Sequence, residues 1–233
     1  MPGILYAIPS PLGGVAIDAL PASALLTVRS LRDFVVENAK TARAFFREAG
    51  MPCPLQELRI SVLADDVSTQ IKTLKEGNNL GLLSEAGCPA IADPGALLVE
   101  AAHREGIRVV PLVGPSSIVL ALMASGLEGQ RFAFCGYLPR DPEGRKRRIR
   151  DLESRSRRER ETQVFIETPY RNDALLASLL EVSSEKTLLC LATDLTLPGE
   201  HIRTRTVTQW RAARHTIGKR PTVFLLLSVA SSP

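Results

Sequence analysis

The chain has 233 residues, a formal net charge of +4 and a hydrophobic content of 45%. This length is enough for one large domain or two smaller ones, each with a buried core. No apolar run approaches the ~18 residues of a membrane span, and the N-terminus lacks the basic start and apolar stretch of a secretory signal.

Four cysteines, Cys53, Cys88, Cys135 and Cys190, lie far apart in the chain. They form no CxxC pair and no metal-ligand spacing with the three histidines, so the sequence does not favour a zinc site. Scattered cysteines of this kind are typical of reduced thiols that pack as small core residues. We therefore expect a cytoplasmic protein without a bound metal.

The first half of the chain alternates short apolar runs with stretches of helical periodicity. Strands are expected at 4–8, 34–36, 58–63, 80–84 and 107–110. Helices are expected at 22–31, 41–49, 67–76 and 96–104. Strands and helices in alternation predict an α/β domain with a doubly wound, mostly parallel sheet of about five strands.

Residues 82–126 hold the most informative turns. A Gly/Pro-rich turn follows the fourth strand, and Asp93 with Pro94 predicts an N-cap and a first helical residue. A Gly-Pro-Ser-Ser turn at 114–117 follows the fifth strand and opens a helix that ends near Gly126. Both turns follow parallel strands, so we expect them at the sheet edge where open α/β sheets bind ligands.

After Gly126 the pattern changes to that of a second α/β domain, with a mixed sheet. Strands are expected at 131–138, 164–167, 187–192, 201–206 and 222–229. Arginine at every second position of 201–206 fits a half-exposed strand, and Trp210 is expected to anchor a short helix. These features place the two domains at 1–115 and 116–233.

Residues 140–160 contain ten Arg/Lys and five Asp/Glu, which gives this segment +5 and leaves −1 for the rest of the chain. Such a block is the electrostatic footprint expected for a polyanion such as RNA. The alternative is a solvated helix with i,i+4 ion pairs Asp151–Arg155 and Glu153–Arg157. Both interpretations stay open.

Five Gly/Pro-containing turns each follow an expected strand. They lie at 9–14, 85–95, 114–117, 167–171 and 193–200. Glycine permits close approach of the backbone to a ligand and proline stiffens a turn, so the pattern favours a binding cleft over ordinary turns. The P-loop, dinucleotide-binding and hydrolase-elbow motifs are absent from the sequence.

The sequence of these turns resembles a known family. The segments that carry the resemblance are LYAIPSPLGG at 5–14, LLSEAGCPAIADPGALLVEAAHREGIRVVPLVGPSS at 82–117, SGLEGQRFAFCGYLPR at 125–140, FIETPYRNDALL at 165–176 and TDLTLPGE at 193–200. Together they resemble the tetrapyrrole (corrin/porphyrin) methylase family and, within it, the ribosomal RNA small subunit methyltransferase I branch. The similarity spans essentially the whole chain and is most specific in the second segment.

The resemblance implies two α/β domains with S-adenosylmethionine bound in a cleft between them, and often a homodimer. By motif, the cofactor is expected to contact Pro9, Ala86, Gly87, Cys88, Ser116, Ser117, Glu167, Thr168, Leu195 and Thr196. The implied activity is methyl transfer to RNA, at a ribose 2′-hydroxyl. Two alternatives stay open: methylation of a small anionic molecule such as a tetrapyrrole, and a cofactor-binding RNA partner without catalysis.

Methyl transfer to a hydroxyl needs a group that accepts or polarises its proton. Glu37 and Glu167, each near an expected strand end, are the carboxylates expected in this role, and Arg43 and Arg171 are expected to hold phosphate. A structural hydrogen bond is the alternative for each glutamate. One departure bears on the acceptor, because the ribosomal branch has Glu-Asp-Thr-Arg where this chain has Glu-Asn-Ala-Lys at 37–40.

Overall fold

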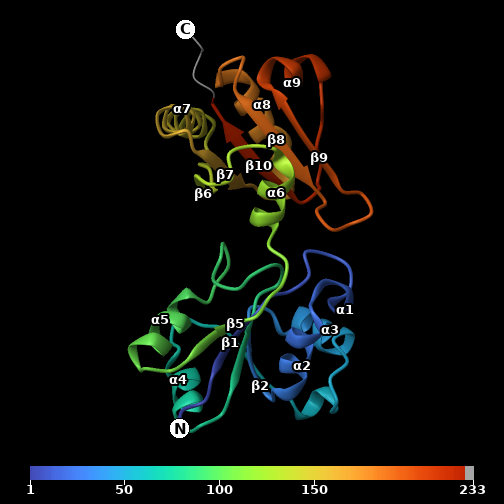
Figure 1. Cartoon of the computed structure of the whole chain (residues 1–233), viewed down its shortest axis with the longest axis vertical. Coiled ribbons are helices and arrows are strands. Elements are labelled where there is room, and N and C mark those ends of the chain that lie inside the picture. Colours follow the sequence, from blue (N-terminus) through green and yellow to red (C-terminus); the bar gives the residue numbers. More distant parts are fainter. Residues whose placement is uncertain (229–233) are drawn as a thin grey trace. The chain divides into compact units, whose positions relative to one another are not determined.

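The computed structural model describes residues 1–228, and the chain divides into two compact units, one of Met1–Ser116 and one that begins at Ser117. Each unit has its own five-stranded sheet with helices packed on it (Figure 1). The expected fold class is confirmed, because one sheet is wholly parallel and the other is mixed.

The sheet of the first unit has the strand order β3-β2-β4-β1-β5. Its strands are β1 (Leu5–Ile8), β2 (Asp33–Val36), β3 (Arg59–Val62), β4 (Leu80–Leu83) and β5 (Val109–Pro111). From β1 the chain crosses β4 to reach β2, whereas from β4 it crosses β1 to reach β5. The strand order therefore reverses next to β1, and ligands of open α/β sheets bind beside the carboxyl ends at such a reversal.

Alternation along the strands sends side chains to two separate cores. Phe34 faces a core shared with the first three helices, and its ring centroid lies 4.3 Å from that of Phe46. Val35 faces the opposite core, beneath the remaining two helices. The helices are α1 (Ala16–Ala19), α2 (Ala22–Ser30), α3 (Ala39–Glu48), α4 (Ser68–Lys75) and α5 (Ala96–Arg104).

Three local features differ from the sequence expectation. The short helix α1 and the 3-10 turn η1 (Leu55–Glu57) were not expected, because neither is long enough to show a helical period. The expectation of an N-cap at Asp93 is wrong. Gly95 occupies that position with φ 128°, a backbone conformation suited to glycine, and α5 begins at Ala96.

The sheet of the second unit has the order β6-β7-β10-β8-β9, in which only the β6–β7 pair is parallel. Its strands are β6 (Phe132–Tyr137), β7 (Thr162–Ile166), β8 (Leu188–Thr193), β9 (His201–Thr206) and β10 (Thr222–Leu227). The end of the last expected strand, Val229, lies outside the described residues. Strand β9 has the bounds expected from its alternating arginines.

The helices of the second unit are α6 (Ser117–Ser125), α7 (Pro142–Glu159), α8 (Asn172–Val182) and α9 (Val207–Ala213), with a 3-10 turn η2 (Pro169–Arg171). The basic segment forms α7, and the Asp141 side chain caps it by accepting a hydrogen bond from Gly144 N at 2.6 Å. Trp210 on α9 is buried in the core, as expected.

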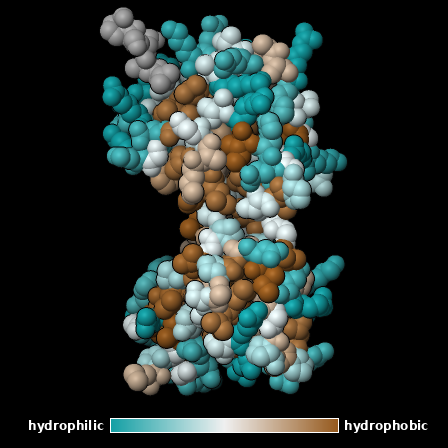
Figure 2. Space-filling view, turned by 45° about the vertical axis from the view of Figure 1, so that its right-hand side comes forward, coloured by the Kyte–Doolittle hydropathy of each residue, from teal (hydrophilic) through white to brown (hydrophobic). Residues whose placement is uncertain are grey.

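On the face drawn in Figure 2, hydrophilic and apolar residues are interspersed at the surface of each unit. In the second unit the large exposed apolar side chains are Val119, Met123, Phe132, Tyr137 and Tyr170. Within residues 1–228, no helix combines the length and apolar character needed to cross a bilayer.

Candidate functional site

Three turns at the carboxyl edge of the parallel sheet are bonded to one another. Ser10 N–H donates to Gly87 O at 2.8 Å, and Gly87 N–H donates back to Ser10 O at 3.0 Å. The Ser10 hydroxyl also donates to Ser84 O at 2.7 Å. These bonds join the turn after β1 to the turn after β4.

The turn after β5 completes this arrangement. The Cys88 thiol donates to Pro115 O at 3.5 Å, which links the second turn to the third. Gly114 lies against Pro9 so closely that a β-carbon at position 114 would stand 2.5 Å from Pro9 Cβ. We call this connected set of turns, residues 9–14, 84–95 and 112–116, the rim.

The middle turn of the rim carries unusual backbone. Ala90 and Ala92 have φ of 65° and 63°, in the left-handed region that costs free energy for a residue with a β-carbon. Gly87 has φ 74°. Such conformations persist only where the surroundings hold them, and they cluster at ligand sites.

Acidic side chains gather beside the rim. Glu37, directly after β2, accepts a hydrogen bond from Glu85 N–H at 3.0 Å through Oε2. Burial, followed by the charge of Glu37, raises the pKa of the half-buried Asp93 to about 6. Burial and then the charge of Asp93 raise the pKa of the Cys88 thiol, so a thiolate nucleophile is disfavoured there.

A pocket of about 280 Å³ opens between the rim and α3. It is lined by Ser10–Gly14 of the first turn, by Leu83–Ala86 of the second and by residues of α3 that include Thr41 and Glu48. Arg43, on the same helix, is exposed and donates to Ala39 O at 3.4 Å. Arg43 does not line the pocket.

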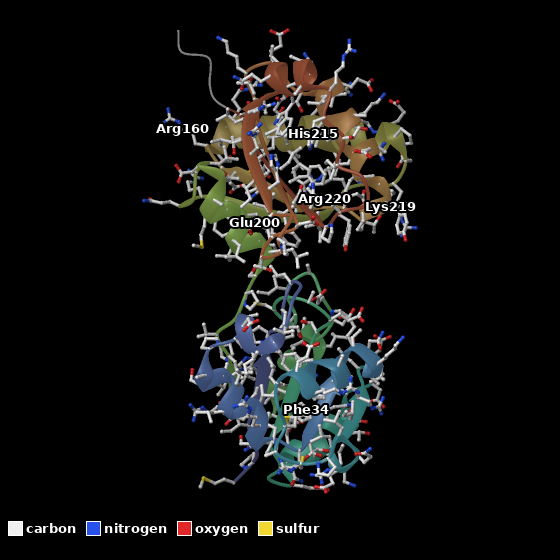
Figure 3. The ribbon with its side chains drawn as sticks, turned by 90° about the vertical axis from the view of Figure 1, so that its right-hand side faces the viewer. Phe34, Arg160, Glu200, His215, Lys219 and Arg220 are labelled. Atoms are coloured by element: carbon white, nitrogen blue, oxygen red, sulfur yellow. The ribbon has the colours of Figure 1, made fainter. Side chains whose placement is uncertain are left out.

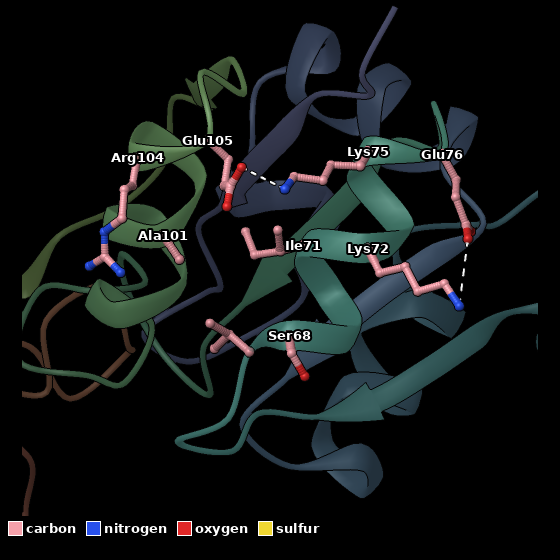
Figure 4. A pocket seen from close by; sticks show the side chains of 9 residues that line it. Ser68, Ile71, Lys72, Lys75, Glu76, Ala101, Arg104 and Glu105 are labelled. Carbon is pink, nitrogen blue, oxygen red and sulfur yellow. Dashed lines mark ion pairs between the residues drawn. The ribbon is translucent and has the colours of Figure 1, made fainter.

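A larger groove, of about 580 Å³, runs between α4 and α5 (Figure 4). Its charged side chains are paired, Lys75 with Glu105 at 2.5 Å and Lys72 with Glu76 at 3.9 Å within its walls, and Arg104 with the neighbouring Glu100 at 2.6 Å. Because these charges are already neutralised and the groove lies along two helices rather than at strand ends, we favour the rim as the functional site.

In the second unit, Glu167 follows β7 and its side chain is fully buried. Glu167 Oε1 accepts from Thr168 N at 2.6 Å and from Arg171 Nε and Nη2 at 2.9 and 2.5 Å. Oε2 has no hydrogen-bond partner among the described residues, although it is buried. A buried acceptor without a donor is costly, so Oε2 is a candidate acceptor for a hydrogen bond from a ligand.

The turn after β8 is held by its own polar groups. Thr196 has φ 67°, and its N–H donates to Glu200 Oε2 at 2.8 Å. Leu195 is buried, whereas Thr196 is exposed. Asp194 accepts from Arg220 Nε at 2.7 Å.

The residues predicted from the sequence fall into two sets. Those in or beside the rim of the first unit are Pro9, Glu37, Ala86, Gly87, Cys88 and Ser116. Those in the second unit are Ser117, Glu167, Thr168, Arg171, Leu195 and Thr196. Sequence reasoning did not single out Ser10 and Ser84, whose only signal is their place within two residues of the end of a buried strand.

Within the part of the chain that the structure describes, no group of three or more His, Cys, Asp and Glu side chains could hold a metal ion. Cys190 is buried, and the other three cysteines are partly buried free thiols. Acid–base and positioning chemistry by carboxylates, hydroxyls and backbone groups is what the rim residues can supply.

Two solved structures with a similar fold are methyltransferases. The methyltransferase CobJ superposes with a TM-score of 0.63 at 18% identity, covering 98% of this chain and 95% of that one. Uroporphyrin-III-C-methyltransferase from Thermus thermophilus gives 0.55 at 21% identity, with coverage of 97% and 94%. At these identities the likeness establishes the fold alone.

Relatives identified by sequence are also named methyltransferases. Proteins named ribosomal RNA small subunit methyltransferase I from Escherichia coli O157:H7 and Xylella fastidiosa are 32% and 34% identical over 200 and 198 residues. The matched regions cover 86% and 84% of this chain, and 68% and 69% of the two relatives. The model of the family Tetrapyrrole (Corrin/Porphyrin) Methylases matches residues 17–210. This protein therefore belongs to the tetrapyrrole methylase family and is a methyltransferase of that family.

Proposed function

We propose that this protein transfers a methyl group from S-adenosylmethionine to a hydroxyl of ribosomal RNA, as the names of its relatives suggest. S-adenosylmethionine supplies a methyl group on a sulfonium, so the protein has to position the acceptor and manage its proton. Positioning alone can provide several kcal/mol of the barrier. The proposal includes a homodimer that acts in the cytoplasm.

The observation that carries the proposal is the bonded rim at the strand-order reversal of the first unit. Pro9, Ala86, Gly87, Cys88 and Ser116 would meet the cofactor from this unit. Backbone groups at Gly87 can approach a ligand closely because the residue has no side chain and adopts φ 74°. The paired bonds between the first two turns hold these groups in place without the ligand.

The second unit would contribute Ser117, Glu167, Thr168, Leu195 and Thr196. The free, buried Oε2 of Glu167 fits a hydroxyl donor such as that of a ribose. Because both Arg171 nitrogens donate to the other oxygen, we assign Arg171 to holding Glu167 rather than to binding phosphate.

Two carboxylates were expected as proton acceptors, and their surroundings favour different roles. Glu167 is fully buried and clamped by Arg171. Glu37 is half-buried at a strand end, and among residues 1–228 the Glu85 N–H is its one donor. We therefore assign proton acceptance to Glu37 and ligand holding to Glu167. Arg43, which is exposed and forms no ion pair among residues 1–228, would hold a phosphate of the acceptor.

The cofactor half of the proposal is tested by thermal denaturation. S-adenosylmethionine at about 100 times its dissociation constant should add about 2.7 kcal/mol to the stability. Gly87→Ala should abolish this gain. Gly106→Ala is the matched control, because Gly106 has φ 65° and nothing lies within 4 Å of its added β-carbon. A melting temperature that does not change when S-adenosylmethionine is added would contradict the proposal.

The acceptor half is tested with radiolabelled S-adenosylmethionine and ribosomal RNA from a strain that lacks the gene. We expect label in the small-subunit RNA, at a position that is unmethylated in the deletion strain. Label in a tetrapyrrole instead would support the small-molecule alternative. Tight RNA binding with no transfer to RNA or tetrapyrrole would support the non-catalytic alternative.

A further inference from the structure

A second basic surface stands on the second unit, formed by residues that no part of the proposed cofactor site uses. We call it the histidine cluster: His201 and Arg205 of β9, Trp210 of α9, and His215, Lys219 and Arg220 of the loop before β10. Figure 3 labels His215, Lys219 and Arg220 within that unit.

The alternation of β9 explains how the cluster forms. His201 and Arg205 lie on the same face of the edge strand, and Arg205 is in register with Leu189 of β8. Leu189 belongs to the core under α7 and α8, and Trp210 Nε1 donates to Leu189 O at 2.8 Å. The tryptophan ring therefore packs on the face from which these basic side chains project.

The rings and cations of the cluster contact one another. The His201 and His215 rings are stacked, with centroids 6.2 Å apart and planes at 22°. The Trp210 centroid lies 5.3 Å from that of His215, and the Arg205 guanidinium carbon lies 5.2 Å from the Trp210 centroid. Two imidazoles whose centroids lie 6.2 Å apart, beside a guanidinium, repel each other when both are protonated.

Two carboxylates near the cluster, Asp173 and Asp194, already form hydrogen bonds or ion pairs. Asp173 of α8 accepts from Ile217 N at 2.7 Å and from Gly218 N at 3.2 Å. Asp194 pairs with Arg220 at 2.7 Å. Positive charge added by protonation of the histidines therefore has no free carboxylate partner within the described cluster.

The loop that carries His215 connects the two second-unit turns of the candidate site. Arg220 reaches the turn after β8 through Asp194 and also donates to Gly199 O. Lys219 Nζ lies 4.9 Å from the ring centroid of Tyr170, in the turn after β7. Asn172 fixes the loop by donating to Arg220 O at 2.7 Å. An anion bound at the cluster would stand beside both turns.

We propose that the histidine cluster binds a phosphodiester group of the RNA acceptor strand, with His201 and His215 taking up a proton from solvent as the anion binds. The ligand is a phosphate oxygen, held by charge-assisted hydrogen bonds from imidazolium and guanidinium groups. This inference rests on RNA being the acceptor, and it assigns part of the RNA contact to a surface other than the Arg-rich helix.

The coupling to pH follows from the groups around His215. Burial first, and then the positive charges of His201, Arg205 and Arg220, lower the pKa of His215, whereas Asp173 acts in the opposite direction. A bound phosphate offsets the repulsion and raises that pKa. Binding therefore takes up protons, and the affinity for RNA should increase as the pH falls.

Fluorescence anisotropy with a labelled oligouridine of about 20 nucleotides tests this coupling at constant ionic strength. For the full chain, we expect the dissociation constant to fall about tenfold from pH 8 to pH 5.5, since one proton taken up gives about tenfold per pH unit at most. His215→Gln and His201→Gln should each reduce that change to about threefold or less. His215→Lys should give tight binding already at pH 8 and keep only the weak pH dependence that His201 contributes, because the lysine charge is permanent.

His103 on α5 provides the matched control, because it is exposed, belongs to the first unit and is the one histidine of the chain outside the cluster. His103→Gln should keep the pH dependence. With only three histidines, imidazole NMR signals can be assigned by substitution, and oligouridine should move the signals of His201 and His215 but not that of His103. Melting temperatures of the variants will identify any that fail to fold.

An unchanged pH dependence in His201→Gln and His215→Gln would overturn the proposal. Inorganic phosphate that moves both histidine signals, with oligouridine that moves neither, would also overturn it and would identify a site for a free anion. A protein that binds RNA with this coupling but never methylates RNA would contradict the proposed function while leaving the cluster's role intact. Methylation of RNA by a protein whose RNA binding does not depend on pH would support the proposed function and contradict the role of the histidine cluster.

Discussion

Arg171 donates from Nε and Nη2 to the same oxygen of Glu167, at 2.9 and 2.5 Å, and leaves the other oxygen of that buried carboxylate without a described partner. The pair fixes the turn after β7. It also leaves Glu167 Oε2 available as an acceptor at a buried position, where the low dielectric strengthens a hydrogen bond.

Removal of the arginine should therefore destabilise the second unit. Arg171→Ala leaves an uncompensated buried charge, and we expect it to lower the free energy of unfolding by about 3 kcal/mol. The control is Arg104→Ala, which breaks another i,i+4 pair, with Glu100 at 2.6 Å, whose side chains are 70% and 64% exposed. That loss should stay below about 1 kcal/mol in urea titrations. Equal losses in both variants would show that the burial of Glu167 has no energetic consequence.

Glu37→Gln tests the assignment of the proton acceptor. The amide keeps the size of the side chain but cannot take a proton, so kcat should fall by about 10² or more, while the affinity for S-adenosylmethionine changes little. Glu57→Gln, on the exposed turn η1, is the control. A Glu37→Gln enzyme with normal kcat would move the assignment to another group.

Asp93 should make stability depend on pH. Its pKa in the folded protein is about 6, above the ordinary value of 3.8. The folded state thus binds its proton more readily, and the stability contributed by this proton is complete below pH 3.8 and is lost as the pH rises through about 6. Asp93→Asn should raise the melting temperature at pH 8 and leave it unchanged at pH 4. An Asp93→Asn variant whose melting temperature is not raised at pH 8 would contradict the raised pKa of Asp93.

Gly114→Ala tests the contact that joins the first and third turns. Its new methyl would stand 2.5 Å from Pro9 Cβ and 2.8 Å from Leu20 Cδ2, so the turns must separate. We expect a loss of about 1–3 kcal/mol and a weaker cofactor-induced thermal shift. At Gly129 nothing lies within 4 Å of an added β-carbon, so Gly129→Ala should alter neither quantity. Normal cofactor binding by Gly114→Ala would mean that the rim is not part of the site.

The Arg-rich helix α7 contains both free and paired arginines. None of the ion pairs among residues 1–228 involves Arg147 or Arg150, whereas Arg158 pairs with Glu159 at 2.8 Å. Arg147→Ala and Arg150→Ala should each reduce the slope of log K against log salt by about 1 for RNA binding. Arg158→Ala should have a smaller effect, because its charge is already neutralised. Equal reductions of the salt slope in all three variants would indicate that RNA binding depends on the net charge of α7 and not on its unpaired arginines.

Of the two ion pairs expected on this helix, the structure forms one. Arg157 lies 4.0 Å from Glu153, whereas Arg155 pairs with Glu161 beyond the end of the helix, at 2.9 Å. An i,i+4 spacing brings two side chains within reach, but a carboxylate from a following segment can compete for the same guanidinium.

The fold class, most of the strand positions and the family follow from the amino-acid sequence. Apolar runs of four to six residues must be buried, so β4 and β10 follow from local physics, whereas β9 follows from the alternation of its arginines. The turn sequences at 82–117 and 193–200 were specific enough to indicate the family before any geometry was known.

Tertiary structure alone decided which side chains meet. The Ser10–Gly87 bonds, the unpartnered oxygen of Glu167 and the stack of His201 on His215 each join residues from different elements, so neither periodicity nor spacing reveals them. The N-cap of α5 is Gly95 rather than Asp93, because the chain takes φ 128° at that position, which suits glycine. Burial and then the charge of Glu37, from another strand end, raise the pKa of Asp93, and the local Asp-Pro sequence reveals neither.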